Sequence, residues 1–258
     1  MTYRDSSFVD QVVIVSGGAT GIGAAAVEAF NEQGAIVACL DRNVEQGTAL
    51  VERLRANGSR IEFFAADVSV KDQVNTAIDQ VVTKLGAPSV LFNHAGTAIV
   101  KPFLDLAESD ILSMLQINVV SMFTVSQAVI PHMIKKGGGT IVCTSSVSGD
   151  IATPNEILYC ASKAACTMVA RGIAVEFQSQ NIRCNSVSPG MVDTPHGRRE
   201  VSELRALGVD VSDEMIAGRQ GRLATPRDIA DVVVFAASSQ SRFVNGANII
   251  VDNCFSAQ

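Results

Sequence analysis

Seven short runs of apolar, mostly β-branched residues recur along the chain, and longer segments with helical periodicity separate them. The runs are apolar throughout rather than alternating, which is typical of strands in a parallel sheet that helices cover on both faces. Right-handed crossovers between such strands give a doubly wound sheet of about seven strands. The expected strands are 12–16, 35–40, 61–65, 89–93, 140–145, 182–187 and 248–251, and the expected helices are 22–33, 44–57, 70–85, 108–136, 157–179 and 226–238.

No repeat, low-complexity segment or interdomain linker interrupts this alternation, so we predict a single α/β domain over residues 1–258. Apolar residues make up 47% of the chain, which is enough for a substantial core. The net charge of −6 and the lack of a basic tract argue against a nucleic acid or an acidic membrane as a partner.

The sequence also bears on location. It has no unbroken run of about 18 apolar residues, so it predicts no membrane span. Residues 1–5 lack the apolar segment of a signal peptide. Six cysteines show neither a Cys-x-x-Cys motif nor paired His and Cys ligand spacing. We therefore expect a reduced, cytoplasmic protein without a metal site.

A glycine-rich turn joins the first expected strand to the first expected helix. Glycines let the backbone turn tightly and approach a phosphate, and the helix N-terminus behind them presents unpaired N–H groups to an anion. The position of the turn in the first strand–helix–strand unit favours dinucleotide binding over an ordinary tight connection. The residues expected to hold the dinucleotide here are Gly17, Thr20, Gly21, Ile22 and Gly23.

Asp41 and Arg42 end the second expected strand. An acidic residue about 20 positions beyond the glycines can accept hydrogen bonds from the adenosine ribose hydroxyls, and it repels a 2′-phosphate. Asp41 therefore favours NAD over NADP. Arg42 leaves the alternative open, because a guanidinium at this place could hold the 2′-phosphate.

Tyr159 and Lys163 are four residues apart in an expected helix, so their side chains share one face. A phenol has a reference pKa near 10. A positive charge about 4 Å away, at an effective dielectric of about 20, contributes roughly 4 kcal/mol, which lowers a pKa by about three units. The pair could then exchange a proton near neutral pH, while the hydroxyl of Ser146 holds a substrate oxygen. The alternative is a core tyrosine beside a solvated lysine.

Taken together, these motifs resemble those of the short-chain dehydrogenase/reductase family over essentially the whole chain. The family's Thr-Gly-x-x-x-Gly-x-Gly pattern matches 16–23, with serine in place of threonine. Its Asn-Asn-Ala-Gly pattern matches 93–96, where we expect the substituted His94 to be neutral and structural. The resemblance implies a Rossmann-like fold and an oxidoreductase that uses a nicotinamide cofactor. The catalytic positions match Asn118, Ser146, Tyr159 and Lys163, and the Pro-Gly turn matches 188–190.

The resemblance also implies a role for each matching residue. Tyr159 exchanges the proton of the substrate oxygen, which Ser146 rather than Ser145 orients. Lys163 lowers the pKa of Tyr159 and binds the nicotinamide ribose. Asn118 holds a water that links Lys163 to solvent, or else it stabilises its helix as a buried amide. Further cofactor contacts are implied for Asp67 and Val68 at the adenine, for Asn93, Ala95 and Gly96 beside the adenosine ribose, and for Pro189, Gly190, Val192 and Thr194 around the nicotinamide.

Two segments are expected to read the substrate. Residues 191–222 are polar and irregular for a compact domain, and we expect a substrate loop there that could include a short helix. Asp150, Asn155 and Glu156 hint at a polar substrate such as a sugar or polyol, although ordinary solvated loop residues would look the same. A hydrophobic alicyclic alcohol or a steroid-like ketone is the alternative.

Two helical stretches, 116–134 and 157–177, carry apolar residues around nearly their whole circumference. Such a helix is buried on all sides. On the outside of a helix-covered sheet this requires a second copy of the chain, so we expect a homo-oligomer, either a tetramer or a dimer. Coverage by the C-terminal loop is the alternative.

The leading hypothesis is therefore an NAD-dependent oxidoreductase that interconverts a secondary alcohol and a ketone of small-molecule size. An NADP-dependent carbonyl or 3-ketoacyl reductase is the alternative within this class. A non-catalytic dinucleotide-binding sensor is the alternative from another class. The intact set Asn118, Ser146, Tyr159 and Lys163 favours catalysis, because a sensor has no chemical need to keep these residues together.

Overall fold

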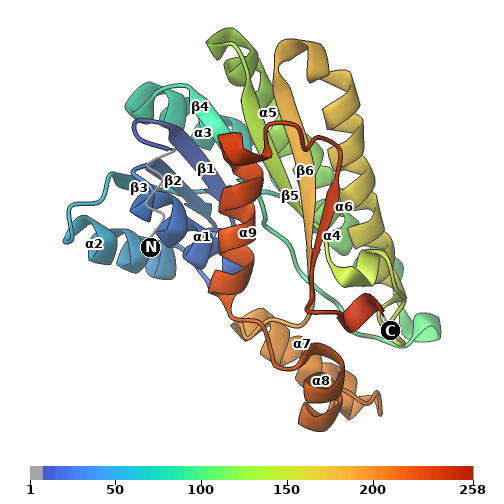
Figure 1. The fold of residues 1–258 in the computed structure, drawn as a ribbon. Coiled ribbons are helices and arrows are strands. Elements are labelled where there is room, and N and C mark those ends of the chain that lie inside the picture. The colour runs from blue at the N-terminus through green and yellow to red at the C-terminus, as the bar shows by residue number, and fades with distance from the viewer. Residues whose placement is uncertain (1–7, 258) are drawn as a thin grey trace.

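The computed structural model describes residues 8–257, so residues 1–5, where no signal peptide is expected, lie outside the described residues. The strands pair in parallel in one seven-stranded sheet with the order β3-β2-β1-β4-β5-β6-β7 (Figure 1). This confirms the predicted doubly wound α/β fold. The strands are β1 (Val12–Ser16), β2 (Ile36–Asp41), β3 (Ile61–Ala65), β4 (Pro88–Asn93), β5 (Gly139–Thr144), β6 (Ile182–Pro189) and β7 (Asn248–Val251).

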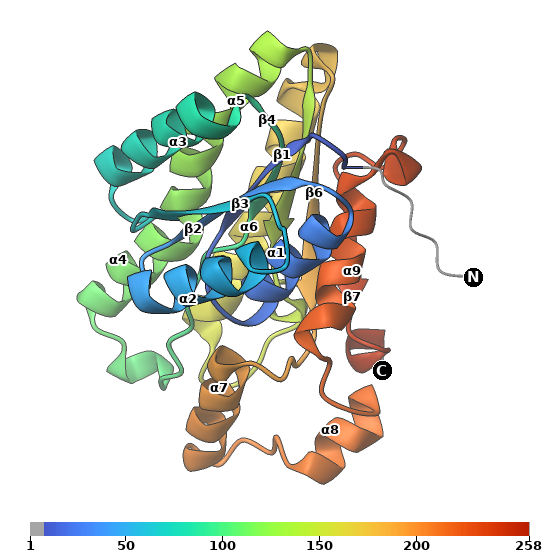
Figure 2. The ribbon, with the colours of Figure 1, turned by 90° about the vertical axis from the view of Figure 1, so that its left-hand side faces the viewer.

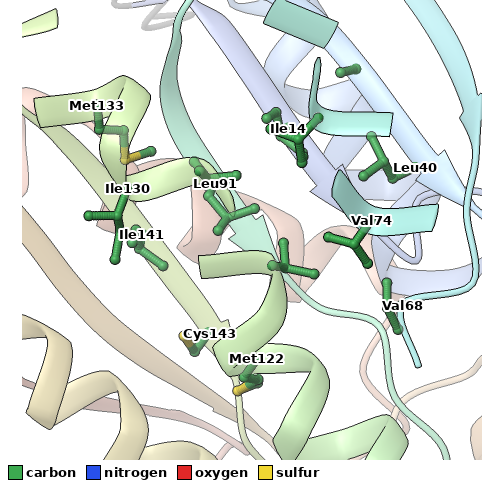
Figure 3. Packing of buried hydrophobic residues seen from close by; sticks show 14 of the residues in the cluster. Ile14, Leu40, Val68, Val74, Leu91, Met122, Ile130, Met133, Ile141 and Cys143 are labelled. Atoms are coloured by element: carbon green, nitrogen blue, oxygen red, sulfur yellow. The ribbon is translucent and has the colours of Figure 1, made fainter. Parts of the chain in front are cut away.

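Helices cover both faces of the sheet and bury an apolar cluster on each. On one face, Ile14, Leu91 and Ile141 of the strands pack against Met122 and Met133 (Figure 3). The helices of this face are α3 (Lys71–Leu85), α5 (Ser121–Lys136) and α6 (Ile157–Glu176), and those of the other face are α1 (Gly21–Glu32), α2 (Val44–Arg55) and α9 (Pro226–Ala237). Short 3-10 turns are η1 (Phe103–Asp105), η3 (Val147–Gly149), η4 (Gln178–Gln180), η5 (Ser239–Ser241) and η6 (Phe255–Ala257).

The expected helix 108–136 consists of three parts: α4 (Glu108–Leu115), a π-helical turn η2 (Gln116–Val120) and α5. The π-helical turn widens the helix around Asn118, and such turns are frequent at functional sites. By length and composition alone the run Glu108–Lys136 could cross a membrane, but half of its most apolar stretch is buried inside the molecule. Core helices of soluble proteins meet the same criteria, so this run is weak evidence for a membrane span.

The predicted substrate loop is not irregular, because it forms two helices, α7 (Pro195–Ala206) and α8 (Asp213–Gln220). Figures 1 and 2 show both helices at one end of the sheet. Each begins at a side-chain cap: the hydroxyl of Thr194 accepts a hydrogen bond from the Gly197 amide, and that of Ser212 accepts one from the Met215 amide. Both helices expose mostly charged side chains, so they lack the apolar period by which helices are recognised in a sequence.

The two stretches that were expected to be buried on all sides keep an exposed apolar stripe in the single chain. Met168 and Val175 of α6 are 60% and 80% exposed. Leu112, Val120 and Phe123 are exposed along the neighbouring run of α4, η2 and α5. The described part of the C-terminal segment does not cover them, so the structure differs here from the alternative of coverage within the chain.

Candidate active site

A cleft of about 790 Å³ lies at the carboxyl ends of the strands. The strand order reverses between β1 and β4, and a crevice at such a switch point is where doubly wound sheets bind ligands. Ser16 fixes this point, because its hydroxyl accepts hydrogen bonds from the amides of His94 at 2.9 Å and Ala95 at 3.2 Å. The ends of β1 and β4 are thereby held together under the cleft.

The glycine-rich turn forms a cradle into which a side chain would not fit. Gly17 has a φ of +69°, and a Cβ there would lie 2.9 Å from the Cα of Ala95. A Cβ on Gly23 would lie 1.9 Å from the carbonyl oxygen of Gly17. The Thr20 side chain makes no capping hydrogen bond, which leaves the first N–H groups of α1 to a ligand. The turn therefore fits a dinucleotide phosphate.

Acidic groups follow β2 and β3 on the same side of the cleft. The carboxylate of Asp41 accepts hydrogen bonds from the amides of Ala19 at 3.0 Å and Asn43 at 2.8 Å, which fix its position beside the glycine-rich turn. Hydrogen bonds from Ser69 hold the pKa of Asp67 below its usual range. Arg42 is 71% exposed, and its nearest carboxylate oxygen, on Asp67, is 3.9 Å away.

The predicted serine and tyrosine meet on the other side of the cleft. Ser146 follows β5 and lies close enough to the phenol of Tyr159, in the first turn of α6, to act against the raised pKa of Tyr159. Its neighbour Ser145 donates instead to the carbonyl oxygen of Lys163 at 2.7 Å and accepts from Thr167 at 2.9 Å. These contacts support Ser146, and not Ser145, as the hydroxyl that works with the tyrosine.

Lys163 and Tyr159 lie on one face of α6, as their spacing predicts. The Lys163 ammonium donates to the carbonyl oxygen of Thr144 at 3.2 Å and lies 5.7 Å from the centre of the Tyr159 ring. The pKa of Tyr159 is nevertheless raised well above 10, first by burial and then by the charges of Glu200 and Glu156. This differs from the expected lowering, because burial and the charges of two carboxyl groups raise the pKa of Tyr159, and only Ser146 acts in the opposite direction.

Asn118 is buried in the π-helical turn and braces the back of the site. Its side chain accepts from the Thr97 amide at 2.8 Å and donates to the Thr97 carbonyl oxygen at 2.8 Å and the Ser162 hydroxyl at 3.0 Å. A Cβ on Gly96 would lie 3.2 Å from Asn118 Oδ1 and 3.5 Å from Lys163 Nζ, so the glycine lets these two groups come together. The contacts of Asn118 match the buried-amide alternative, and its water-holding role stays a prediction.

Most of the predicted site residues line the cleft, but three do not. Gly23 and Asn118 lie behind the lining, and Asn93 is turned away from it. The Asn93 amide donates to the carbonyl oxygen of Met122 at 3.2 Å and to the hydroxyl of Ser126 at 3.3 Å, so it anchors α5 instead of forming the ribose wall. The predicted residues that line the cleft are Gly17, Thr20, Gly21, Ile22, Asp41, Arg42, Asp67, Val68, Ala95, Gly96, Ser146, Tyr159, Lys163, Pro189, Gly190, Val192 and Thr194.

The sequence did not predict that two acidic side chains form a corner beside Tyr159. Glu156 and Glu200 both line the cleft, and the carboxylate of Glu200 lies 3.3 Å from His196 Nε2. The three-residue spacing of Glu156 from Tyr159 was the available signal, because it places Glu156 at the start of the helix that carries Tyr159. Asp150, which was expected to join them, instead accepts a hydrogen bond from Asn248 outside the cleft.

His94, which departs from the family pattern, stacks on Phe92 and has its Nδ1 2.9 Å from the hydroxyl of Thr144. Burial, together with the charges of Lys163 and His196, lowers the pKa of His94 to about 3, so the ring is neutral. Between residues 8 and 257, no group of three or more His, Cys, Asp or Glu side chains could hold a metal ion.

The doubly wound sheet, the phosphate cradle and the tyrosine–serine pair define an oxidoreductase of the nicotinamide-dependent class. Comparison with known proteins identifies the family within this class. A family model described as enoyl-(acyl carrier protein) reductase matches residues 17–256. The chain belongs to the short-chain dehydrogenase/reductase family, which acts on small-molecule substrates.

Relatives within the family carry different activities. The chain is 35% identical to D-threitol dehydrogenase of Mycolicibacterium smegmatis, over 94% of this chain and 91% of that protein. It is 32% identical to a 3-oxoacyl-(acyl carrier protein) reductase of Thermotoga maritima, over 94% and 96%. A gluconate 5-dehydrogenase from Burkholderia cenocepacia, solved with NADP and tartrate, superposes with a TM-score of 0.89 at 29% identity, covering 99% of both chains. The protein is thus an enzyme acting on an alcohol or the corresponding ketone.

Proposed function

We propose that the protein is an NAD-dependent dehydrogenase that interconverts a secondary alcohol and a ketone. The observation that supports this most directly is that Ser146, Tyr159 and Lys163 line the same cleft as the glycine-rich turn. A sensor of dinucleotides would need the turn but not these three residues. The relatives named as alcohol dehydrogenases support the same reaction.

Each of the three residues has a separate task. In the oxidation, Ser146 holds the substrate oxygen, and Tyr159 removes the carbinol proton as general base. Lys163 supplies positive charge behind the phenol from its place on Thr144. When bound, the nicotinamide ring takes the hydride from the carbinol carbon, or returns it in the reverse direction. The residues proposed to hold the cofactor are Gly17, Thr20, Gly21 and Ile22 at the phosphates, Asp41 and Asp67 at the adenosine, and Pro189, Gly190, Val192 and Thr194 near the nicotinamide.

The proton role is tested by Tyr159→Phe, which removes only the phenolic oxygen. We expect turnover to fall by about 10² to 10⁴-fold, while calorimetric titration still detects cofactor binding. Ser146→Ala should lower turnover in the same direction, because the substrate oxygen loses its hydrogen bond. A Tyr159→Phe variant with full turnover would refute the proposal, and a wild type that binds cofactor but oxidises no alcohol would favour the sensor.

The preference for NAD rests on the fixed carboxylate of Asp41. Two backbone amides hold it beside the turn, so it stays in place to accept from the ribose and to repel a 2′-phosphate. We expect NADH to bind more tightly than NADPH in separate titrations. Asp41→Ser should reduce this difference by about tenfold or more, whereas Arg42→Ala should leave it in place.

An NADP-dependent 3-ketoacyl reductase is the second candidate. It is favoured by the exposed Arg42, whose ion pair with Asp67 is long at 3.9 Å, and by the relative from Thermotoga maritima. Under this alternative NADPH would bind more tightly than NADH, and Arg42→Ala would abolish that preference. The two titrations therefore separate the candidates.

A further inference from the structure

Glu156 is buried in a way that its position in the chain does not explain. It immediately precedes α6, where a carboxylate would ordinarily cap the helix or interact with its dipole. Its side chain makes no capping hydrogen bond, and the residue is only 1% exposed. Within residues 8–257, Glu156 Oε1 is the one buried side-chain nitrogen or oxygen without a hydrogen-bond partner.

The unpartnered oxygen belongs to a residue that lines the cleft next to Tyr159. Buried polar atoms in folded proteins are nearly always hydrogen-bonded, so an exception in a ligand cleft indicates a place for a ligand atom. Glu156 is the N-cap residue of α6 and stands three positions before Tyr159, so both residues lie at the start of this helix and line the same cleft. A substrate carbinol at Tyr159 would therefore bring a substituent one or two carbons away to Glu156.

A second carboxyl group, that of Glu200 on α7, closes this corner from the other side of the cleft. It lies close enough to interact directly with Glu156. Burial and, second to it, the charge of Glu200 raise the pKa of Glu156 to about 8. Two adjacent carboxyl groups cannot both be ionised at low cost, so one retains its proton. Glu200 also contacts His196. The pair therefore offers one hydrogen-bond donor and several acceptors.

One donor and several acceptors together match a hydroxyl group, which both donates and accepts a hydrogen bond. An ammonium group only donates, so it could not accept the hydrogen bond that the protonated carboxyl group donates. A carboxylate or phosphate on the substrate would be repelled by Glu200. We propose that Glu156 and Glu200 together bind a second hydroxyl of the substrate, so that diols or polyols are preferred over simple alcohols. This inference rests on the proposed dehydrogenase function.

The test compares 2,3-butanediol with 2-butanol, which differ by one hydroxyl on the same skeleton. We expect the wild type to have a kcat/KM with NAD that is about 10- to 100-fold higher for the diol. Glu156→Leu should bring the two values close together, because it lowers the value for the diol relative to that for 2-butanol. Glu200→Gln should reduce the ratio as well. Glu214→Gln is the control, because Glu214 is an exposed carboxylate on the neighbouring helix α8 and does not line the cleft.

Equal kcat/KM values in the wild type, or an unchanged ratio in Glu156→Leu, would overturn the proposal. So would faster oxidation of 3-amino-2-butanol than of the diol, because the corner would then bind an ammonium. Calorimetric binding of both alcohols to Tyr159→Phe, with and without Glu156→Leu, gives a readout that needs no turnover. If the diol binds selectively through Glu156 but the wild type oxidises neither alcohol, the proposed function fails while the hydroxyl site stands.

Discussion

The carboxyl group of Glu156 shows how a single residue can link the site to the stability of the fold. Burial raises the pKa of Glu156 from an ordinary 4.5 to about 8, and the neighbouring Glu200 and Glu203 contribute to this, while Thr153 acts in the opposite direction. The folded protein thus keeps a proton that the unfolded chain releases between these two pH values. The free energy of unfolding must therefore fall as the pH rises through this window.

We predict that Glu156→Gln stabilises the protein at high pH. The amide has the same shape and carries no charge, so the advantage over the wild type should grow from about pH 5 to about pH 8 and reach the order of a few kcal/mol. Urea unfolding at several pH values measures it, with Glu52→Gln, at an exposed position of α2, as the control. A difference that did not vary with pH would contradict the raised pKa.

The residue scale also shows what the sequence could and could not predict of the site. The spacing of Ser146, Tyr159 and Lys163 was sufficient to bring them together, because one helix and one strand end carry all three. The pKa of Tyr159 was not predictable, since it depends on burial and on Glu200, which lies far along the chain and reaches the phenol only through α7. Asn93 was misplaced because a motif gives no information about which way a side chain turns.

At the scale of elements, the helices α7 and α8 depend on a buried glutamine at their end. Gln220 accepts a hydrogen bond from the Met191 amide at 2.9 Å and donates to the carbonyl oxygens of Met191 at 2.7 Å and Arg222 at 2.8 Å. The amide of Ala224 also donates to the Met191 carbonyl oxygen, at 2.9 Å. The segment therefore ends beside the residue at which it begins.

We predict that Gln220→Ala lowers stability by about 1–3 kcal/mol, because it leaves buried backbone groups without partners. It should also raise KM for the alcohol more than KM for the cofactor, since α7 carries Glu200 and His196 to the substrate end. Denaturant unfolding and steady-state kinetics measure the two effects. Gln80→Ala, at an exposed position of α3, is the control. An unchanged KM would mean that the helices keep their place without this anchor.

Elements with a clear period were predictable, and those formed by tertiary contacts were not. The ends of β1, β3 and β7 match the predicted runs, because each is a short apolar stretch between turns. The π-helical turn around Asn118 reflects contacts with Thr97 and α6, which no local pattern encodes. The helices α7 and α8 were missed because their charged faces hide the helical period.

On the scale of the whole molecule, we propose that the exposed apolar stripe of α6 and of the run 108–136 is an interface between copies of the chain. Isolated exposed apolar residues are ordinary, but a contiguous stripe on two adjacent helices marks an interaction surface. The stripe comprises Leu112, Val120, Phe123, Ile134, Ile157, Met168 and Val175. The stripe of one copy could pack against the same stripe of a second copy about a two-fold axis.

We predict that Met168→Glu combined with Val175→Glu dissociates the oligomer. Burying two unpaired charges should raise the dissociation constant by about 10²-fold or more. Sedimentation velocity over a range of concentrations measures it. Phe243→Glu is the control, because Phe243 is fully exposed and lies outside the stripe. A wild type that is monomeric at all concentrations would rule out the interface.

The closure of the segment 191–222 on itself has a consequence for how such enzymes diversify. Hydrogen bonds among Met191, Gln220 and Ala224 hold its two ends together. A replacement of the residues between them could therefore join to the same two points without moving the strands or the glycine-rich turn. We expect that the part beyond Thr194, residues 195–222, can be exchanged between relatives to change the substrate specificity, while Val192 and Thr194 stay beside the proposed nicotinamide site.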